Sequence, residues 1–394
     1  MKRILTLVLA LAFVLALAAC GGGTSPTPTP TPTAAPEVTE ETPDVEVPDD
    51  GEVPADGTYE IALVTDIGSI DDGSFNQGAW EGIKAYADAN GITYTYFRPT
   101  EDTDTERLAN IAGAVSKGAK VIVCPGFLFS FAIFEAQTLY PDVQFILLDT
   151  EPDDPANPYT GANMAAANVH SILYREEQSG FLAGYGAVID GFRNLGYLGG
   201  MEMPPVTRFG YGYIQGAELA ATELGLAAGD VTINYWYSGG FEATDDIFSK
   251  MNAWYSSGTE IVFACGGQIY QSCLAAANTN DTFIIGVDKD QGPESERFIT
   301  SATKGLAASV EIALTALYDN GGVWDETRAG VTATLGINED CVELPTNPDS
   351  WRFRTWTVEE YDALVALIKS GEVVVSDDFI NAPVVELVTV DYQD

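Results

Sequence analysis

The chain has 394 residues, of which 58 are acidic and 18 are basic, so its formal net charge at pH 7 is −40. This excess of acid makes nucleic acid and anionic membrane surfaces poor partners, because like charges repel. With one histidine and five cysteines, none of them in a Cys-x-x-Cys pair, the chain has almost no ligands for a zinc site. The sequence therefore predicts neither a metal nor a cofactor.

The N-terminus predicts a secretory signal peptide over residues 1–19. Lys2 and Arg3 precede an apolar run that ends in small residues and is short for a membrane span. The following LAAC (17–20) resembles the bacterial lipobox, in which cleavage precedes the cysteine and a diacylglycerol is attached to its thiol. We expect a mature chain that starts at Cys20 and is lipid-anchored to the cell membrane on its extracytoplasmic side. An uncleaved membrane anchor and an ordinary secreted protein are the alternatives.

Residues 20–57 predict a stiff, solvated tether. They contain repeated Thr-Pro pairs followed by nine acids and no base, a composition that cannot bury a core. When these nine acids and the two signal-peptide bases are removed from the charge of −40, the rest of the chain still carries −33. That remainder, 58–394, exceeds one typical domain and suits two lobes.

Beyond residue 58, apolar runs rich in Val, Ile and Tyr alternate with segments of helical period. The predicted strands are 61–66, 93–97, 120–126, 145–150, 195–200, 232–237, 260–267 and 283–288. The predicted helices lie near 76–90, 103–117, 171–190, 208–225, 243–257, 269–279, 304–320 and 357–370. Continuous apolar strands that alternate with helices indicate parallel sheets covered on both faces.

The alternating units form two sets, which predicts an α/β fold of two doubly wound parallel-sheet lobes. We expect the first lobe to comprise 58–165 plus about 292–330, and the second to comprise 166–291 plus about 331–394. In such sheets, ligands bind at the carboxyl ends of the strands, here in a cleft between the lobes.

The residues that follow the predicted strands fit a binding site for a small molecule. They are glycines and short acids, namely Asp66, Gly126, Asp149, Gly239, Gly240, Gly266, Gly267 and Asp288. Glycine lets a backbone approach a ligand closely, and carboxylates accept hydrogen bonds from hydroxyl or ring N–H groups.

Six segments in this order resemble the basic membrane protein family of substrate-binding lipoproteins, in particular its purine nucleoside receptor A branch. They are VTDIGSIDDGSFNQGAWEGI (64–83), REEQSGFLAGYGA (175–187), LGYLGGMEMPPVTRFGYGYIQG (195–216), YSGGFEATD (237–245), IIGVDKDQ (284–291) and TSATKG (300–305). The resemblance covers nearly the whole mature chain and implies a fold of the type I periplasmic-binding-protein kind. The strong acidity departs from the family's name.

The resemblance also implies a pocket for a purine nucleoside. Phe75, in the Ser-Phe-Asn motif, and Phe241, in the Gly-Gly-Phe motif, match the two rings that stack on the base. Stacking on both faces of a flat heterocycle favours closure of the lobes. An ordinary core position is the alternative for each phenylalanine taken alone.

Polar residues of the family pocket also have matches. Asp66 and Asp149 match the acids that meet the base, with Asn76 or Ser74 beside them, although Asp66 also suits a loop cap. The acid and lysine that bind the ribose are matched by Asp288 and Lys304. A backbone N–H of Gly266 or Gly267 would complete the contacts to the hydroxyls.

This family membership would imply a small-molecule ligand, best matched by a purine nucleoside, and delivery to an ABC permease. No P-loop occurs in the chain, so the ATPase would be a separate protein. A sugar or an autoinducer-like ligand, and a ligand sensor for a signalling partner, are the alternatives. A secreted nucleoside hydrolase that uses the paired acids Asp71 and Asp72, or Asp288 and Asp290, is less favoured, because nothing establishes two carboxylates that flank a glycosidic bond.

Overall fold

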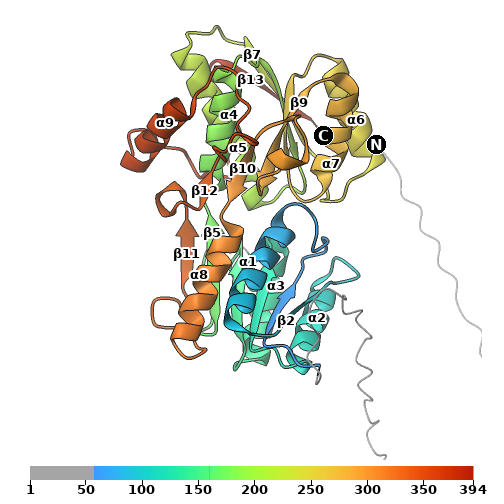
Figure 1. Ribbon diagram of the computed structural model, residues 1–394, viewed down its shortest axis with the longest axis vertical. Coiled ribbons are helices and arrows are strands. Elements are labelled where there is room, and N and C mark those ends of the chain that lie inside the picture. The colour runs from blue at the N-terminus through green and yellow to red at the C-terminus, as the bar shows by residue number, and fades with distance from the viewer. Residues whose placement is uncertain (1–56, 159, 394) are drawn as a thin grey trace, which may run out of the picture. The chain divides into compact units, whose positions relative to one another are not determined.

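The structure is a computed structural model that describes residues 57–158 and 160–393 (Figure 1). The predicted signal peptide, the predicted lipidation site Cys20 and nearly all of the predicted tether lie outside these residues. Within the described residues, the chain forms two sheets of six and seven strands that are almost entirely parallel. The predicted α/β class with two parallel sheets is therefore confirmed.

The first sheet has the strand order β11-β5-β4-β3-β1-β2, and every pair in it is parallel. Its strands are β1 (Ile61–Val64), β2 (Tyr94–Phe97), β3 (Val121–Pro125), β4 (Gln144–Leu148), β5 (Val169–Tyr174) and β11 (Thr332–Leu335). Helices α1 (Phe75–Asn90) and α8 (Leu306–Asp319) pack on one face, and α2 (Asp104–Ser116) and α3 (Ser130–Leu139) on the other. This sheet and its four helices are the first lobe.

The second sheet has the order β12-β10-β9-β8-β6-β7-β13, and only the β10–β12 pair is antiparallel. Its strands are β6 (Asn194–Gly199), β7 (Val231–Tyr237), β8 (Ile261–Cys265), β9 (Phe283–Asp288), β10 (Phe298–Lys304), β12 (Val342–Glu343) and β13 (Val388–Gln393). Helices α4 (Glu176–Ile189) and α5 (Pro204–Glu223) cover one face, and α6 (Asp245–Ser256) and α7 (Ile269–Asn280) the other. With α9 (Val358–Ser370), these elements are the second lobe.

Apolar residues at every strand position explain why both faces of each sheet are covered. In β1, Ile61 and Leu63 join the core under α1 and α8, whereas Ala62 and Val64 join the core under α2 and α3. Successive side chains of a strand point to opposite faces, so a strand that is apolar throughout needs helices on both sides.

Three helices begin at threonines that satisfy their free amides. The hydroxyl groups of Thr103, Thr244 and Thr357 accept hydrogen bonds from the N–H three residues further on, at the starts of α2, α6 and α9. At α9, Glu360 also bonds back to the N–H of Thr357, which completes a capping box.

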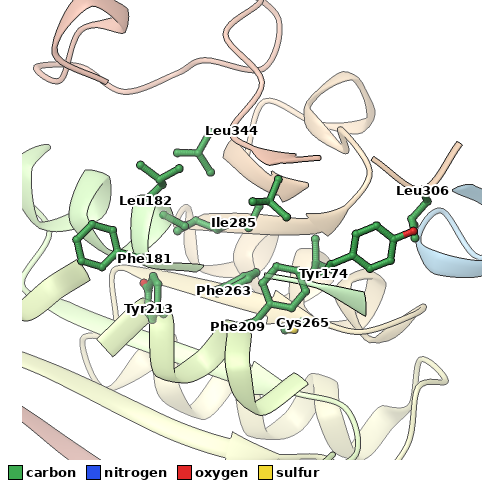
Figure 2. Packing of buried hydrophobic residues seen from close by; sticks show 14 of the residues in the cluster. Tyr174, Phe181, Leu182, Phe209, Tyr213, Phe263, Cys265, Ile285, Leu306 and Leu344 are labelled. Atoms are coloured by element: carbon green, nitrogen blue, oxygen red, sulfur yellow. The ribbon is translucent and has the colours of Figure 1, made fainter. Parts of the chain in front are cut away.

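Glycines allow α4 and α5 to pack with their backbones in contact. A Cβ on Gly184 of α4 would strike the carbonyl oxygen of Tyr213, and a Cβ on Gly216 of α5 would strike that of Phe181. Figure 2 shows aromatic and aliphatic side chains from these helices and from the second sheet packed into one core. The two helices are therefore closely packed against each other on one face of the second sheet.

The chain passes between the lobes three times, after β5, after β10 and after β11. Sheet membership differs from the expected boundaries at 165, 291 and 330. Strand β5 lies beyond 165 yet belongs to the first sheet, β10 lies within 292–330 yet belongs to the second, and β11 returns to the first. Each sheet thus contains at least one strand that lies beyond the lobe boundary expected from the sequence.

Each of the eight predicted strands and eight predicted helices has a counterpart in the structure, with two kinds of difference. The prediction of one helix over 171–190 was wrong at its start, because β5 occupies residues up to Tyr174. The prediction omitted the helix α3 and the strands β5, β10, β11, β12 and β13. None of the helices in the described part of the chain is both long enough and apolar enough to cross a membrane.

Candidate ligand-binding site

A cavity lies where the strands of both sheets end. Its lining includes all nine residues that the sequence analysis selected for ligand binding. They are Asp66, Phe75, Asn76, Asp149, Phe241, Gly266, Gly267, Asp288 and Lys304. Residues from the first lobe and from the second lobe are thus brought to one cavity.

A loop after β1 supplies one end of the cavity and is held by two acids. Asp66 Oδ1 accepts the N–H of Ile67 at 2.7 Å and of Gly68 at 2.8 Å, so the loop-capping role considered for this residue is present. The side-chain amide of Asn76 donates to Asp66 Oδ1 and to Asp72 Oδ2, both at 3.1 Å. The amide donors of Asn76 are therefore occupied, while its Oδ1 is buried without a partner among the described residues.

Asp72 holds the start of α1 and is not free for a ligand. It accepts hydrogen bonds from the backbone N–H groups of Ser74, Asn76 and Gln77. Burial raises the pKa of Asp72 to about 6, although these hydrogen bonds oppose the shift. The loop keeps Asn76 in place through this carboxylate.

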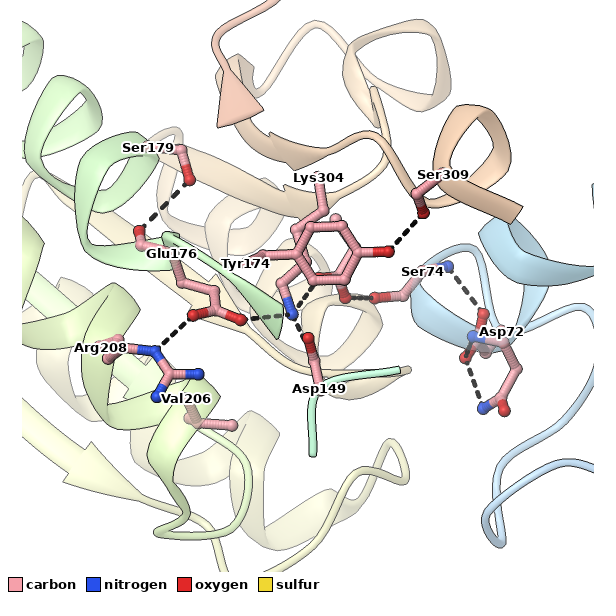
Figure 3. Close-up of polar contacts among 12 residues, drawn as sticks. Asp72, Ser74, Asp149, Tyr174, Glu176, Ser179, Val206, Arg208, Lys304 and Ser309 are labelled. Atoms are coloured by element: carbon pink, nitrogen blue, oxygen red, sulfur yellow. Dashed lines mark hydrogen bonds and ion pairs between the residues drawn. The ribbon is translucent and has the colours of Figure 1, made fainter. Parts of the chain in front are cut away.

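A buried ion pair joins the two lobes inside the cavity. Lys304 Nζ, at the end of β10, donates to Asp149 Oδ2 at 2.5 Å, and Asp149 follows β4 of the first sheet (Figure 3). The other oxygen of Asp149, Oδ1, is buried and has no hydrogen-bond partner among the described residues. Burial raises the pKa of Asp149 to about 7 despite the nearby lysine.

A second contact between the lobes involves Asp288. Ser74 Oγ of the first lobe donates to Asp288 Oδ2 at 2.5 Å. The hydroxyl of Ser74, the alternative to Asn76 as a residue beside the base, is therefore bonded to an acid of the other lobe. Burial raises the pKa of Asp288, and Lys304 opposes this shift. Asp149 and Asp288 both have positive φ angles, 66° and 63°, at the ends of corresponding strands. Aspartate is among the few residues that tolerate this left-handed conformation.

Phe75 and Phe241 line the cavity from opposite lobes, and both are partly exposed. Phe75 is the first residue of α1, and its ring lies 4.7 Å from Lys304 Nζ. Phe241 lies against glycines. A Cβ on Gly266 would come within 2.8 Å of its ring carbons Cδ1 and Cε1, and one on Gly267 within 2.8 Å of its Cβ. These two glycines therefore leave room for the Phe241 side chain.

The sequence analysis missed several residues of the cavity. Its apolar wall also contains Leu128, Met203, Pro205, Val206, Phe209 and Val287. Those around 203–209 lie at the start of α5, and their apolar type is equally typical of a core helix, so no sequence signal marked them.

The acids considered for hydrolysis have structural partners. Asp72 caps α1, and Asp290 accepts hydrogen bonds from the N–H of Gly292 and the side chains of Asn347 and Ser350. Within the described residues, no group of three or more His, Cys, Asp or Glu side chains is placed to hold a metal ion. The four cysteines in this part of the chain are buried and free.

Two parallel sheets joined by three chain crossings, with a cavity at their facing strand ends, define the class of two-lobed solute-binding proteins. Residues 60–378 match the family described as "ABC transporter substrate-binding protein PnrA-like". The chain belongs to this family, as the six sequence segments indicated.

Similar proteins agree with this assignment. The "ABC transporter nucleoside-binding protein BmpA" of Lactococcus lactis is 29% identical over 243 residues, which are 58% of this chain and 64% of that protein's length. "Basic membrane protein A1" of Borrelia garinii is 28% identical over 80% of this chain and 87% of its own. A solved ABC transporter solute-binding protein from Aeropyrum pernix has 20% identity and a TM-score of 0.67, covering 81% of this chain and 94% of its own, which shows the shared fold.

Proposed function

We propose that this protein binds a purine nucleoside in the cavity between its lobes and delivers it to an ABC permease driven by a separate ATPase. The observation that carries this proposal is that Phe75 and Phe241, one from each lobe, line the same cavity as two buried oxygens that have no hydrogen-bond partner among the described residues. A flat heterocycle that carries N–H groups satisfies both features.

The hydrogen-bonding capacity of the cavity supports a ligand rich in donors. Asn76 Oδ1 and Asp149 Oδ1 are buried acceptors with no partner among the described residues, and an unmet buried acceptor costs about 1–3 kcal/mol. Ring N–H and amino groups of a purine and the hydroxyls of a ribose are donors. Binding such a ligand removes the penalty of these two oxygens.

Charge supports a neutral nucleoside over a phosphorylated one. Among the residues that line the cavity, five are acidic and Lys304 is the single base. The ammonium of Lys304 is already shared by buried carboxylates. A phosphate would add negative charge to an acidic, poorly solvated site, which is unfavourable.

The N-terminal sequence supports placement at the membrane surface through a diacylglycerol on Cys20, followed by the tether of residues 20–57. This part of the proposal is tested by expressing the full chain with the change Cys20→Ala in a bacterial host. We expect the wild-type chain to remain with the membrane fraction and the variant to be released. Release of both proteins would contradict lipid anchoring.

Calorimetric titration of the purified protein tests the ligand class. We expect saturable binding of one or more of inosine, guanosine and adenosine, much weaker binding of the corresponding 5′-monophosphate, and no binding of ribose or hexoses. Binding of a sugar without any nucleoside would overturn the purine assignment. Release of free base during incubation would instead identify a hydrolase.

Transport and sensing share the same cavity, so a separate measurement distinguishes them. We expect deletion of the coding sequence to abolish uptake of the labelled nucleoside by whole cells. Unchanged uptake combined with a lost transcriptional response to the nucleoside would favour a sensor.

A further inference from the structure

Three buried carboxylates surround the ammonium group of Lys304. Its Nζ lies 2.5 Å from Asp149 Oδ2, 3.3 Å from Glu176 Oε1 and 3.8 Å from Asp288 Oδ1. The side chain of Lys304 is only 2% exposed, and those of the three acids are no more than 6% exposed. The charge on this lysine therefore depends on neighbouring groups of the protein rather than on water.

Glu176, the first residue of α4, does not line the cavity but links Lys304 to a second cation. Arg208 Nε, in α5, donates to Glu176 Oε2 at 2.6 Å, and the Glu176 side chain is fully buried (Figure 3). Burial alone would raise the pKa of Glu176, but Arg208 and Lys304 outweigh it and lower this pKa. Glu176 is therefore ionised at neutral pH.

Glu176 lies in the same lobe as Lys304, whereas Asp149 lies in the other lobe. Lys304, Glu176 and Arg208 belong to β10, α4 and α5 of the second lobe, whereas Asp149 follows β4 of the first. The contact between Lys304 and Glu176 is internal to one lobe and does not require the other. The contact between Lys304 and Asp149 exists only while the lobes are together.

We propose that Glu176, fixed by Arg208, is a positioning residue that keeps the ammonium of Lys304 charged and directed into the ligand cavity, in addition to the contacts that the first lobe provides. This inference rests on the proposed function of the cavity as a ligand-binding site. It assigns to Glu176 a role exerted through Lys304 rather than through contact with the ligand.

The environment of Lys304 explains why it needs such a residue. A buried lysine without a counterion loses its proton, because desolvation penalises the charged form. The rings of Phe75, Phe209 and Tyr174 lie 4.7, 5.2 and 5.4 Å from Nζ and stabilise only that charged form. Burial lowers the pKa of Lys304, but the three carboxylates outweigh it and raise this pKa.

The titratable and charged groups that face Lys304 come from six elements or their ends. They are Asp149 after β4, Tyr174 of β5, Glu176 of α4, Arg208 of α5, Asp288 of β9 and, more distantly, Cys265 of β8. Of these, Glu176 is the one carboxylate whose partners both lie in the second lobe and whose other oxygen is already held by a cation.

The first experiment measures Lys304 directly in the ligand-free protein. Lysine labelled with ¹³C is followed by NMR from pH 7 to pH 11, and the Lys304→Met variant identifies the Lys304 resonance. We expect Glu176→Gln to lower the pKa of Lys304. The matched control is Glu177→Gln, which removes an equally buried neighbouring carboxylate that makes no ion pair with Lys304, and there we expect the Lys304 resonance to titrate as in the wild-type protein.

The second experiment measures affinity for the tightest-binding nucleoside between pH 6 and pH 9. We expect Glu176→Gln to weaken binding by on the order of tenfold or more at pH 7, since removing one partner of a buried ion pair has at least this effect, and by more at pH 9. Glu176→Asp should recover part of the loss. Glu177→Gln should bind as the wild-type protein does at every pH.

An unchanged Lys304 titration in Glu176→Gln overturns the inference, including when binding weakens equally at all pH values, because such a loss indicates a structural role. If Glu176→Gln does not fold, Glu176→Asp replaces it. That change keeps the negative charge but shortens the side chain by one methylene, which moves the carboxylate away from Lys304. An intermediate lowering of the Lys304 pKa then supports the inference, and no lowering overturns it. Absence of nucleoside binding by the wild-type protein would reject the proposed function while leaving the ligand-free titration informative.

Discussion

Lys304 and Asp149 are 155 residues apart in the chain, yet Lys304 Nζ donates a 2.5 Å hydrogen bond to Asp149 Oδ2. One residue belongs to the second sheet and the other follows a strand of the first, so this bond connects the lobes at the floor of the cavity. Both side chains are almost fully buried. Each charge therefore depends on the other, and the pair is a sensitive point for mutation.

Replacing Lys304 by methionine should destabilise the protein strongly at pH 8. The change leaves Asp149, Glu176 and Asp288 buried without their shared cation, and breaking a buried ion pair in this way costs about 3–5 kcal/mol. The loss should be smaller at pH 5.5, where protonation of a carboxyl relieves the uncompensated charge. Urea unfolding at both pH values measures it.

The control for this prediction is Lys289→Met. Lys289 Nζ also joins the lobes, through Glu81 at 2.5 Å, but these two side chains are 23% and 45% exposed. Water solvates both groups when the pair is lost, so the free energy of unfolding should fall by less than about 1 kcal/mol. Equal losses for the two lysine variants would contradict the importance of burial.

Replacing Glu177 by glutamine should stabilise the protein above neutral pH. The Glu177 side chain is 1% exposed, and within the described residues neither oxygen has a hydrogen-bond partner from another residue, although Arg175 Nη1 lies 3.6 Å away. Burial, followed by the charge of Glu176, raises the pKa of Glu177 to about 7. The carboxylate is therefore held in a site that disfavours its charge.

The sign of this effect follows from proton binding. Between the ordinary glutamate pKa, about 4.3, and the folded value, the folded state binds more protons than the unfolded state, so wild-type stability falls as pH rises through this window. Glu177→Gln cannot lose a proton there. We expect it to be more stable than the wild-type protein by roughly 1–2 kcal/mol at pH 8 and close to it at pH 5. A variant that is less stable at pH 8 would contradict this prediction.

Replacing Gly184 by alanine should separate α4 from α5. The new Cβ would strike the backbone carbonyl oxygen of Tyr213, which cannot move as a side-chain tip can. Overpacking of this kind costs about 1–3 kcal/mol or more. Thermal unfolding should show a clear decrease in Tm.

The helical glycine Gly113 offers the matched control. A Cβ there would lie 3.4 Å from the Phe97 ring, an ordinary van der Waals distance. Because alanine is a better helix former than glycine by up to about 1 kcal/mol, Gly113→Ala should leave Tm unchanged or raise it. A decrease in both variants would indicate that glycine is needed for another reason.

Replacing Phe241 by alanine should weaken nucleoside binding by on the order of tenfold or more, since stacking of one base on an aromatic ring contributes about 1–3 kcal/mol. Phe75→Ala should have a similar effect. Calorimetric titration measures both. Phe248→Ala is the control, because Phe248 lies in α6 and packs against the core beside that helix, so it should lower stability and leave affinity unchanged.

Most elements of the fold could be read from the sequence because parallel strands covered on both faces need continuous apolar runs. The strands that the sequence analysis missed lack such a continuous, clearly bounded apolar run. Strand β10 contains the buried polar residues Thr300, Ser301 and Thr303, and β5 runs directly into α4 without a turn residue. Strand β13 pairs with β7, more than a hundred residues earlier, so only the assembled sheet fixes its position.

The candidate site was also only partly predictable from the sequence. The sequence by itself determined the residues that follow the strands, because strand ends of a parallel sheet share one edge, and their motifs identified the family. Only the tertiary structure decided how those residues are used. The amide N–H groups of Asn76 are occupied while its oxygen has no hydrogen-bond partner in the described part of the chain, Gly266 makes room for Phe241, and Glu176 connects Arg208 to Lys304. Such pairings join distant parts of the chain, and they follow from packing and burial, which local sequence patterns do not encode.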